Sequence, residues 1–263
     1  MKIKIAREQR IIDALQMHAS FIDNAGLFHG KMGIALYFFH LGRLTDREEF
    51  TLFAEELLDE VIEALPRGLP VDFANGLTGI GWAVEYLIRN GFVDADADEV
   101  LEEIDAKIWR VFIHEACTID LIVSTGYYLT SRLSYRADND EDMKALHMKY
   151  LIILLADEIE RQITAGNTSA WLYHLLTELR RLNVFNYKVE KLLTMLEKDT
   201  NHYLIPCIPR LTASEVDRIM NSKAVKSKYA GFDMRRIPVH ARWGLKHGLA
   251  GFGLQQICIE HGL

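Results

Sequence analysis

Apolar residues recur at helical spacing in the stretches that separate a set of glycine-rich phrases. Within 50–65 and again within 100–112, apolar side chains lie three or four positions apart, which predicts amphipathic helices that each bury one face. These residues are Phe50, Phe53, Leu57, Leu58, Val61, Ile62 and Leu65 in the first stretch, and Val100, Leu101, Ile104, Ile108, Val111 and Phe112 in the second. No alternating run of strand length occurs, so the pattern predicts an all-α protein.

Several of these helices are preceded by a recognisable start signal. A threonine or aspartate stands three positions before a glutamate, so that its side chain can cap the first free backbone amides while the glutamate reaches back. The pairs are Thr45 and Glu48, Asp96 and Glu99, and Thr212 and Glu215. We therefore expect helices to begin just after residues 45, 96 and 212.

A Gly-x-x-Gly phrase followed by aliphatic residues occurs three times, within 26–36, 73–82 and 244–254. Weaker copies lie in register within 120–129 and 167–172, so the second-glycine slot falls at 33, 79, 126, 170 and 251. The last step in this series is nearly double the others, which indicates a degenerate or missing copy. Such recurrence predicts a repeat architecture, in which each unit covers the apolar face of its neighbour.

Each repeat is interpreted as an outer amphipathic helix, a turn, and an inner helix that opens at the glycine phrase. The inner helices expected within 34–41, 80–88 and 127–133 are apolar on most sides, as helices surrounded by others should be. The glycines remove side chains where helix ends crowd together and allow positive φ in the turn. Repeated hairpins of this kind form either a closed α/α toroid or an open superhelix.

The repeats run end to end through 263 residues, which predicts a single domain over 1–263. The formal net charge of −7 argues against nonspecific nucleic-acid binding. Cys117, Cys207 and Cys258 are odd in number and scattered, as is typical of reduced thiols in a cytoplasmic protein. The N-terminus has no apolar signal core, and no apolar run approaches the ~20 residues that cross a bilayer, so we expect no membrane association.

An irregular basic segment interrupts the repeats at about 204–243. Three prolines fall in it, and between 218 and 246 there are eight Lys or Arg residues against one acid, Asp233. One interpretation is a solvated connector with a short helix after Thr212. The other is a cationic flap over the mouth of the toroid, which would bind an acidic peptide or a phosphate group.

The phrases within 26–36 and 244–253 resemble the repeats of the lanthionine synthetase C-like family. The resemblance implies an α/α toroid whose Gly-x-x-Gly turns ring one end of the barrel. It also implies a zinc ion there, which lowers the pKa of a peptide cysteine thiol so that the thiolate adds to a dehydrated serine or threonine and closes a thioether ring. The family's zinc ligands are two cysteines and a histidine, in a Trp-Cys-x-Gly and a Cys-His-Gly phrase.

This sequence departs from the family at the zinc ligands. Lys246-His247-Gly248 stands where Cys-His-Gly is expected, and no Trp-Cys phrase occurs around 201–203. A lysine cation does not replace a thiolate ligand, so we expect no zinc cofactor. An alternative metal site would need His202, Cys207 and His247 to converge, since three protein ligands and a water make a catalytic zinc site.

Other residues are candidates for chemistry at the same turns. His29 occupies in the first repeat the position that His247 occupies in the last. Closure of a ring would bring these two repeats together, and the paired histidines would then serve as a general base or as a peptide-binding site. Asp72 and Asp120, a few residues before their turns, are either acids and bases or helix caps. Asn75 and Ser124 are interpreted as turn residues. The set expected to bind a ligand is Lys246, His247, Trp243, Asn75 and His29.

Three functional hypotheses follow, and they leave open whether the protein is an enzyme. The first is a peptide-binding, non-zinc accessory component of peptide modification, whose partner is a peptide or protein with acidic character. The second is an active cyclase or lyase that uses His247, His29 and Asp72. The third is a carbohydrate-processing α/α toroid with carboxylates and aromatic platforms at its mouth. Self-association is left open, because an array with a gap exposes an edge.

Overall fold

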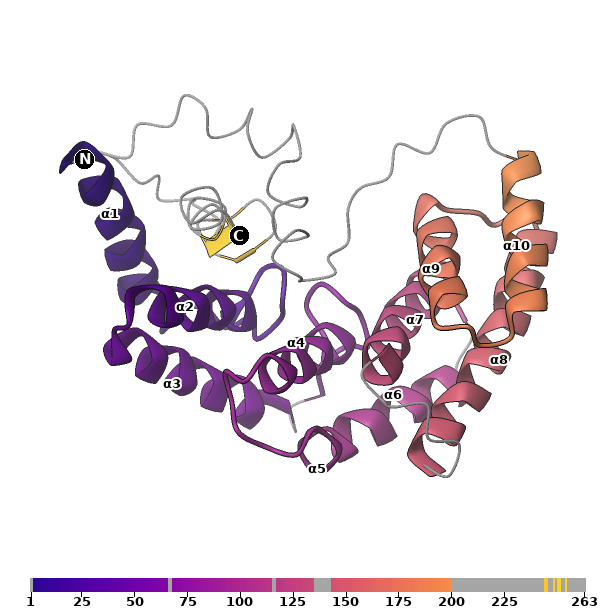
Figure 1. Ribbon diagram of the computed structural model, residues 1–263, viewed down its shortest axis with the longest axis horizontal. Helices are drawn as coiled ribbons and strands as arrows, with labels where there is room; N and C mark the ends of the chain where they lie inside the picture. Colours follow the sequence, from indigo (N-terminus) through magenta and orange to yellow (C-terminus); the bar gives the residue numbers. More distant parts are fainter. Residues whose placement is uncertain are drawn as a thin grey trace. The chain divides into compact units, whose positions relative to one another are not determined.

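The computed structural model describes residues 2–65, 68–114, 117–134 and 143–199, together with Gly244, Leu245, Gly248, Ala250, Gly251 and Leu254. These residues form ten helices and no strand, which confirms the all-α prediction (Figure 1). The basic segment 204–243, the helix expected after Thr212, and the candidates His202, Cys207, Trp243, Lys246 and His247 lie outside the described residues. None of the described helices has the length and apolarity required to span a bilayer.

The described chain divides into two compact units, which we treat separately. The first holds residues up to Ala83 and the described positions of 244–254, and the second runs from Val84 to residue 199. The first contains α1 (Lys2–Ala19), α2 (Lys31–Thr45), α3 (Glu48–Ala64) and the start of α4 (Leu77–Arg89). The second contains the end of α4 and six more helices, α5 (Ala97–Val100), α6 (Glu102–His114), α7 (Ile119–Ser134), α8 (Met143–Thr164), α9 (Ala170–Arg181) and α10 (Asn186–Asp199).

In the first unit the inner helix α2 packs along the outer helix α3 (Figure 1). Every residue from Met32 to Phe39 is buried, as expected for an inner helix. Phe50, Leu57 and Val61 of α3 are buried, which confirms the amphipathic stripe, whereas Ile62 at its edge is exposed. The hydrophobic pattern therefore identified both the helices and their layers.

The helix expected after Thr45 forms and begins at Glu48, but the prediction that Thr45 caps it is wrong. Thr45 is the last residue of α2, and its hydroxyl donates to the carbonyl of Leu41 instead of capping α3. The chain reverses at Asp46, which adopts the left-handed region with φ of 52°, and Arg47 precedes α3 without a side-chain cap. The prediction at Asp96 is confirmed, because its carboxylate accepts the backbone N–H of Asp98 at 2.7 Å at the start of α5.

His40, near the end of α2, makes the first unit sensitive to acid. Burial, followed by the positive charge of Arg43, lowers the pKa of its imidazole from 6.5 to about 4. The unfolded chain therefore binds more protons than the folded chain between these values, and stability falls as the pH drops through this window.

We expect the wild-type protein to lose up to about 3 kcal/mol between pH 7 and pH 4 through His40 alone. The measurement is urea unfolding at several pH values for the wild type and for His40→Gln, which cannot titrate. The wild type should lose more stability than the variant as the pH falls, while His18→Gln, at an exposed position of α1, should follow the wild type. Parallel curves for the wild type and His40→Gln would contradict the assignment.

In the second unit, α7 packs against α6, α8 and α9, and α10 packs against α8 and α9. Most of α7 is buried, including Tyr127, Tyr128 and Leu129, so it is the inner helix that the apolar run within 127–133 predicts. Glu160 of α8 binds Lys188 and Lys191 of α10, and these cations lower the pKa of its carboxyl to about 2. Ion pairs therefore join α8 to α10 in addition to packing.

Candidate functional site

The turn that leads into α2 is closed by its own backbone. The N–H of Gly30 donates to the carbonyl of Gly26 at 3.1 Å, and the N–H of Lys31 donates to the carbonyl of Asn24 at 2.8 Å. The Asn24 side chain also accepts the N–H of Gly26 at 2.7 Å. The side-chain amide of Asn24 thus fixes the turn where the first glycine phrase begins.

The turn that leads into α4 repeats this geometry. The N–H of Gly76 donates to the carbonyl of Asp72 at 3.1 Å, and that of Leu77 donates to the carbonyl of Pro70 at 2.8 Å. Residues 46 positions apart therefore make the same bonds, and the repeat seen in the sequence is a structural one. The carboxylate of Asp72 accepts the N–H groups of Ala74 and Asn75 at 2.9 and 2.7 Å, which confirms its interpretation as a turn cap.

The second glycine of each phrase is required by a close approach of backbone. A Cβ atom at this position would lie about 2 Å from the carbonyl oxygen of the residue six positions earlier, far inside van der Waals contact. The distances are 2.3 Å from Gly33 to Leu27, 2.0 Å from Gly79 to Phe73 and 2.0 Å from Gly251 to Leu245. The expectation of positive φ is wrong for the described glycines of these phrases, because positive φ occurs at Gly68, Gly91 and Gly166 instead.

The first two turns are joined to each other. The N–H of Phe28 donates to the carbonyl of Ala74 at 2.7 Å, and the side-chain amide of Asn24 donates to Oδ1 of Asn75 at 2.8 Å. A Cβ on Gly26 would lie 2.2 Å from Cα of Asn75, so the two backbones touch. The repeat pattern does not point to Asn24, because Pro70 takes its place in the second phrase.

The last phrase meets the first from the other side. A Cβ on Gly244 would lie 2.4 Å from the carbonyl oxygen of Phe28 and 2.7 Å from Cα of His29. The Leu245 side chain comes within 2.9 Å of the Cβ position of Gly33. The first and last glycine phrases therefore lie side by side, and the three turns form one rim within the first unit. We call this group of turns, 24–33, 70–79 and the described positions of 244–251, the glycine rim.

Three of the predicted site residues, His29, Asp72 and Asn75, lie on the glycine rim. His29 is exposed, with its ring edge-on to Phe28 at a centroid distance of 6.4 Å. Asn75 is half-buried, and its side-chain oxygen accepts a hydrogen bond from Asn24. Phe28 packs in turn against Phe73 at 5.8 Å. The glycine rim thus places polar side chains beside the aromatic ring of Phe28.

The weaker copy within 120–129 does not form a turn of this kind. Helix α7 already begins at Ile119, capped by the Thr118 hydroxyl, so Asp120 lies in its first turn and Ser124 is buried in the helix. The prediction of turn residues here is wrong. A Cβ on Gly126 would lie 2.4 Å from Cδ2 of Leu175, which shows that this glycine serves helix packing.

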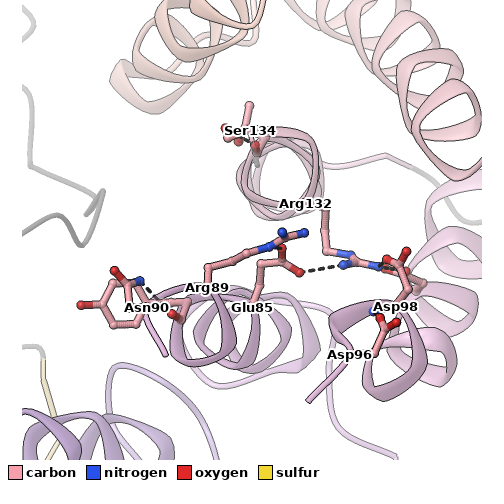
Figure 2. Close-up of polar contacts among 10 residues, drawn as sticks. Glu85, Arg89, Asn90, Asp96, Asp98, Arg132 and Ser134 are labelled. Atoms are coloured by element: carbon pink, nitrogen blue, oxygen red, sulfur yellow. Dashed lines mark hydrogen bonds and ion pairs between the residues drawn. The ribbon is translucent and has the colours of Figure 1, made fainter. Parts of the chain in front are cut away.

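The second unit holds a buried ionic cluster that the sequence did not reveal (Figure 2). Arg132 of α7 is fully buried and donates to Glu85 at 2.6 Å, to Asp98 at 2.8 Å and to Asp105 at 2.9 Å. These partners come from α4, α5 and α6, so one guanidinium joins four helices. We call Arg132 and its three carboxylate partners the Arg132 cluster.

The charges of the Arg132 cluster are balanced by its surroundings. Arg89 binds Glu85 at 2.8 Å, and Lys144 lies 3.7 Å from Asp98, so three cations face three carboxylates. Tyr128 donates to Asp105 at 2.6 Å, and burial, followed by the Asp105 charge, raises its pKa well above the usual value. Although burial lowers the pKa of Arg132, Tyr128, Asp105 and Glu85 raise it overall, so the guanidinium remains charged. Removal of Arg132 would leave the buried carboxylate of Glu85 without this partner.

Cys117 is the one cysteine among the described residues. Cys117 precedes α7 and donates to the carbonyl of Phe112 at 3.5 Å, and burial, followed by the charge of Glu158, raises the pKa of its thiol. A thiol with a raised pKa is a poor source of the thiolate that zinc binds. Within the described residues no group of three His, Cys, Asp or Glu side chains is arranged to hold a metal.

Comparison with known proteins gives one match. The family model described as lanthionine synthetase C-like protein matches residues 22–262, which is most of the chain and includes all three phrases of the glycine rim. No curated protein and no solved structure matches the chain.

Proposed function

The chain belongs to the lanthionine synthetase C-like family, and from this premise we propose that it binds a peptide at the glycine rim as an accessory, non-zinc component of peptide modification. The family relation supplies the expectation of a peptide ligand and of an α/α toroid. The replacement of the Cys-His-Gly phrase by Lys246-His247-Gly248 removes a thiolate ligand, which argues against zinc-dependent cyclisation by this chain.

The observation that carries the proposal is the convergence of three turns on one rim. Neighbouring turns of the glycine rim carry His29 and Asn75, and His29 lies beside the ring of Phe28. Amide and imidazole groups donate and accept hydrogen bonds, so they suit the backbone and polar side chains of a peptide. An apolar ring beneath such groups adds contact area.

Zinc would supply thiolate activation in this family, but the donors of this chain fit it poorly. Lys246 takes the place of a cysteine ligand, and the Cys117 thiol donates to the Phe112 carbonyl of α6. We therefore attribute to the rim the binding and orientation of a peptide and assign it no bond-forming step.

The carbohydrate-processing alternative has weaker support. It needs two carboxylates that converge beside an aromatic platform. At the glycine rim the Asp72 carboxylate already accepts two backbone N–H groups. The cyclase alternative retains one favourable feature, the exposed imidazole of His29, and is decided by the experiment below.

The test is the binding of a fluorescein-labelled synthetic peptide that carries one dehydroalanine, one cysteine and several aspartates, followed by anisotropy. We expect His29→Ala and Asn75→Ala each to weaken binding by about tenfold, which corresponds to about 1.4 kcal/mol. The matched controls are His18→Ala and Asn90→Ala, exposed residues outside the glycine rim, which should bind like the wild type. Thermal unfolding identifies any variant that loses affinity by losing its fold.

The same samples are analysed by mass spectrometry for thioether formation, with and without added zinc. Binding without thioether formation supports an accessory role. Thioether formation that depends on His29 would replace the proposal with the cyclase alternative, and equal affinity of the rim variants and the wild type would overturn it.

A further inference from the structure

Large apolar side chains are exposed along the first half of α8. Met143, Leu146 and Tyr150 are spaced three and four residues apart and remain 74, 53 and 56% exposed. The buried side of the same helix, including Met148, Leu151 and Leu155, faces its neighbours, so these three residues point away from the core. No other described helix exposes three large apolar side chains in this way.

The apolar stripe of α8 is accompanied by positive charge. Between Met143 and Ala156 the sequence contains Lys144, His147 and Lys149 and no acidic residue. Lys144 and His147 are exposed, and Lys144 lies near Asp98 at the edge of the stripe. We call Met143, Lys144, Leu146, His147 and Tyr150 the α8 face. On a chain of net charge −7, this stretch of helix carries lysines and no acid of its own.

The outer face of α3 has the opposite character. Its exposed apolar residues are Leu52 and Ile62, and they are surrounded by exposed carboxylates. These acids are Glu48, Glu55, Glu56, Asp59 and Glu63. None of the five forms an ion pair among the described residues, unlike Glu49 and Glu60, which bind Arg47 and Lys31. We call these five acids with Leu52 and Ile62 the α3 face.

We propose that the α8 face of one copy of this chain binds the α3 face of a second copy. Leu52 and Ile62 would lie against the exposed apolar stripe, while the free carboxylates meet Lys144 and His147. Because two copies of net charge −7 repel each other generally, association requires a place where a cationic apolar surface meets an acidic one. The α8 face and the α3 face provide that complementarity within one sequence.

The proposed contact is heterologous, because it joins two different surfaces. A dimer formed in this way keeps one free α8 face and one free α3 face, so further copies add until a ring closes or a short chain forms. This property distinguishes it from a symmetric contact between two α8 faces, and it determines the design of the experiment.

The test measures mass by sedimentation velocity for the wild type and two variants. Leu146→Glu with Tyr150→Glu removes the α8 face, and Glu55→Lys with Glu56→Lys removes the α3 face. We expect the wild type to associate with rising concentration, and the association constant to fall about tenfold when NaCl rises from about 50 to about 500 mM. Each variant alone should be a monomer. Their mixture should form a one-to-one dimer and nothing larger, since each partner supplies one intact face.

The matched control is Glu102→Lys with Glu103→Lys, which makes the same charge change at exposed positions of α6 and should associate like the wild type. Circular dichroism verifies that each variant is folded. A wild type that stays monomeric at all concentrations would overturn the proposal. So would association of the α3-face variant alone, which would indicate contact between two α8 faces, or a mixture of the two variants that remains monomeric.

Discussion

Arg132→Met is expected to lower the free energy of unfolding by about 3–5 kcal/mol, the loss typical when one partner of a buried ion pair is removed. The substitution keeps an unbranched apolar stem in the site but removes the guanidinium that binds three carboxylates. Glu85 is fully buried, so it cannot recover the lost interaction from water. Urea unfolding followed by circular dichroism measures the effect.

Two further variants identify the origin of this loss. Lys191→Met removes one cation from the exposed pair with Glu160 and should cost less than about 1 kcal/mol, because solvent screens surface ion pairs. Adding Glu85→Leu to Arg132→Met should restore part of the lost stability, since the buried carboxylate is removed together with its partner. A loss below about 1 kcal/mol for Arg132→Met would mean that the guanidinium does not balance these acids.

The sequence predicted the helices because their evidence is local. The stripe at Phe50, Leu57 and Val61 and the run of inner residues after Gly33 depend on spacings of three and four, which a single helix satisfies by itself. The glycine phrases could also be recognised in the sequence, because the same short backbone contact requires glycine at Gly33, Gly79 and Gly251. Regular local rules therefore determined both the layers and the three turns of the glycine rim.

The Arg132 cluster escaped prediction for the converse reason. Arg132 lies in a helix that is apolar on most sides, and its partners Glu85, Asp98 and Asp105 precede it by 47, 34 and 27 residues. No helical spacing links positions so far apart in the sequence. Only the packing of four helices brings them together, so the cluster is a property of the tertiary structure.

Gly126 shows that one spacing can serve two physical purposes. It stands in register with Gly33 and Gly79, and the sequence therefore placed a turn before it. In the structure α7 continues through that position, and the neighbours of Gly126 are the side chains of Leu175 and Leu155. A glycine in the sequence indicates that a side chain would not fit at its position. It does not indicate whether backbone atoms or side-chain atoms occupy the neighbouring space.

This distinction yields the second large effect, a comparison of Gly79→Ala with Gly126→Ala. At Gly79 the new methyl group would lie 2.0 Å from the Phe73 carbonyl oxygen, and relief requires movement of the turn that also holds Gly76 and Asp72. We expect a loss of more than about 3 kcal/mol or failure to fold. At Gly126 the obstacle at 2.4 Å is the end of the Leu175 side chain, which can change rotamer. The cost there should be about 1 kcal/mol, because overpacking is offset by the better helix propensity of alanine.

Urea unfolding of both variants decides between two explanations of the repeat. Where Gly79→Ala is too unstable for a full unfolding curve, resistance to proteolysis is measured instead. If backbone contact is the reason for the glycine phrase, Gly79→Ala lowers stability much more than Gly126→Ala does. Gly33→Ala should lower it nearly as much as Gly79→Ala, because its Cβ would lie 2.3 Å from the Leu27 carbonyl oxygen. Equal losses at residues 79 and 126 would show instead that both glycines serve side-chain packing alone. The glycine rim would then lack the backbone constraint that holds His29 and Asn75 in place, and the proposed peptide site would lose its structural basis.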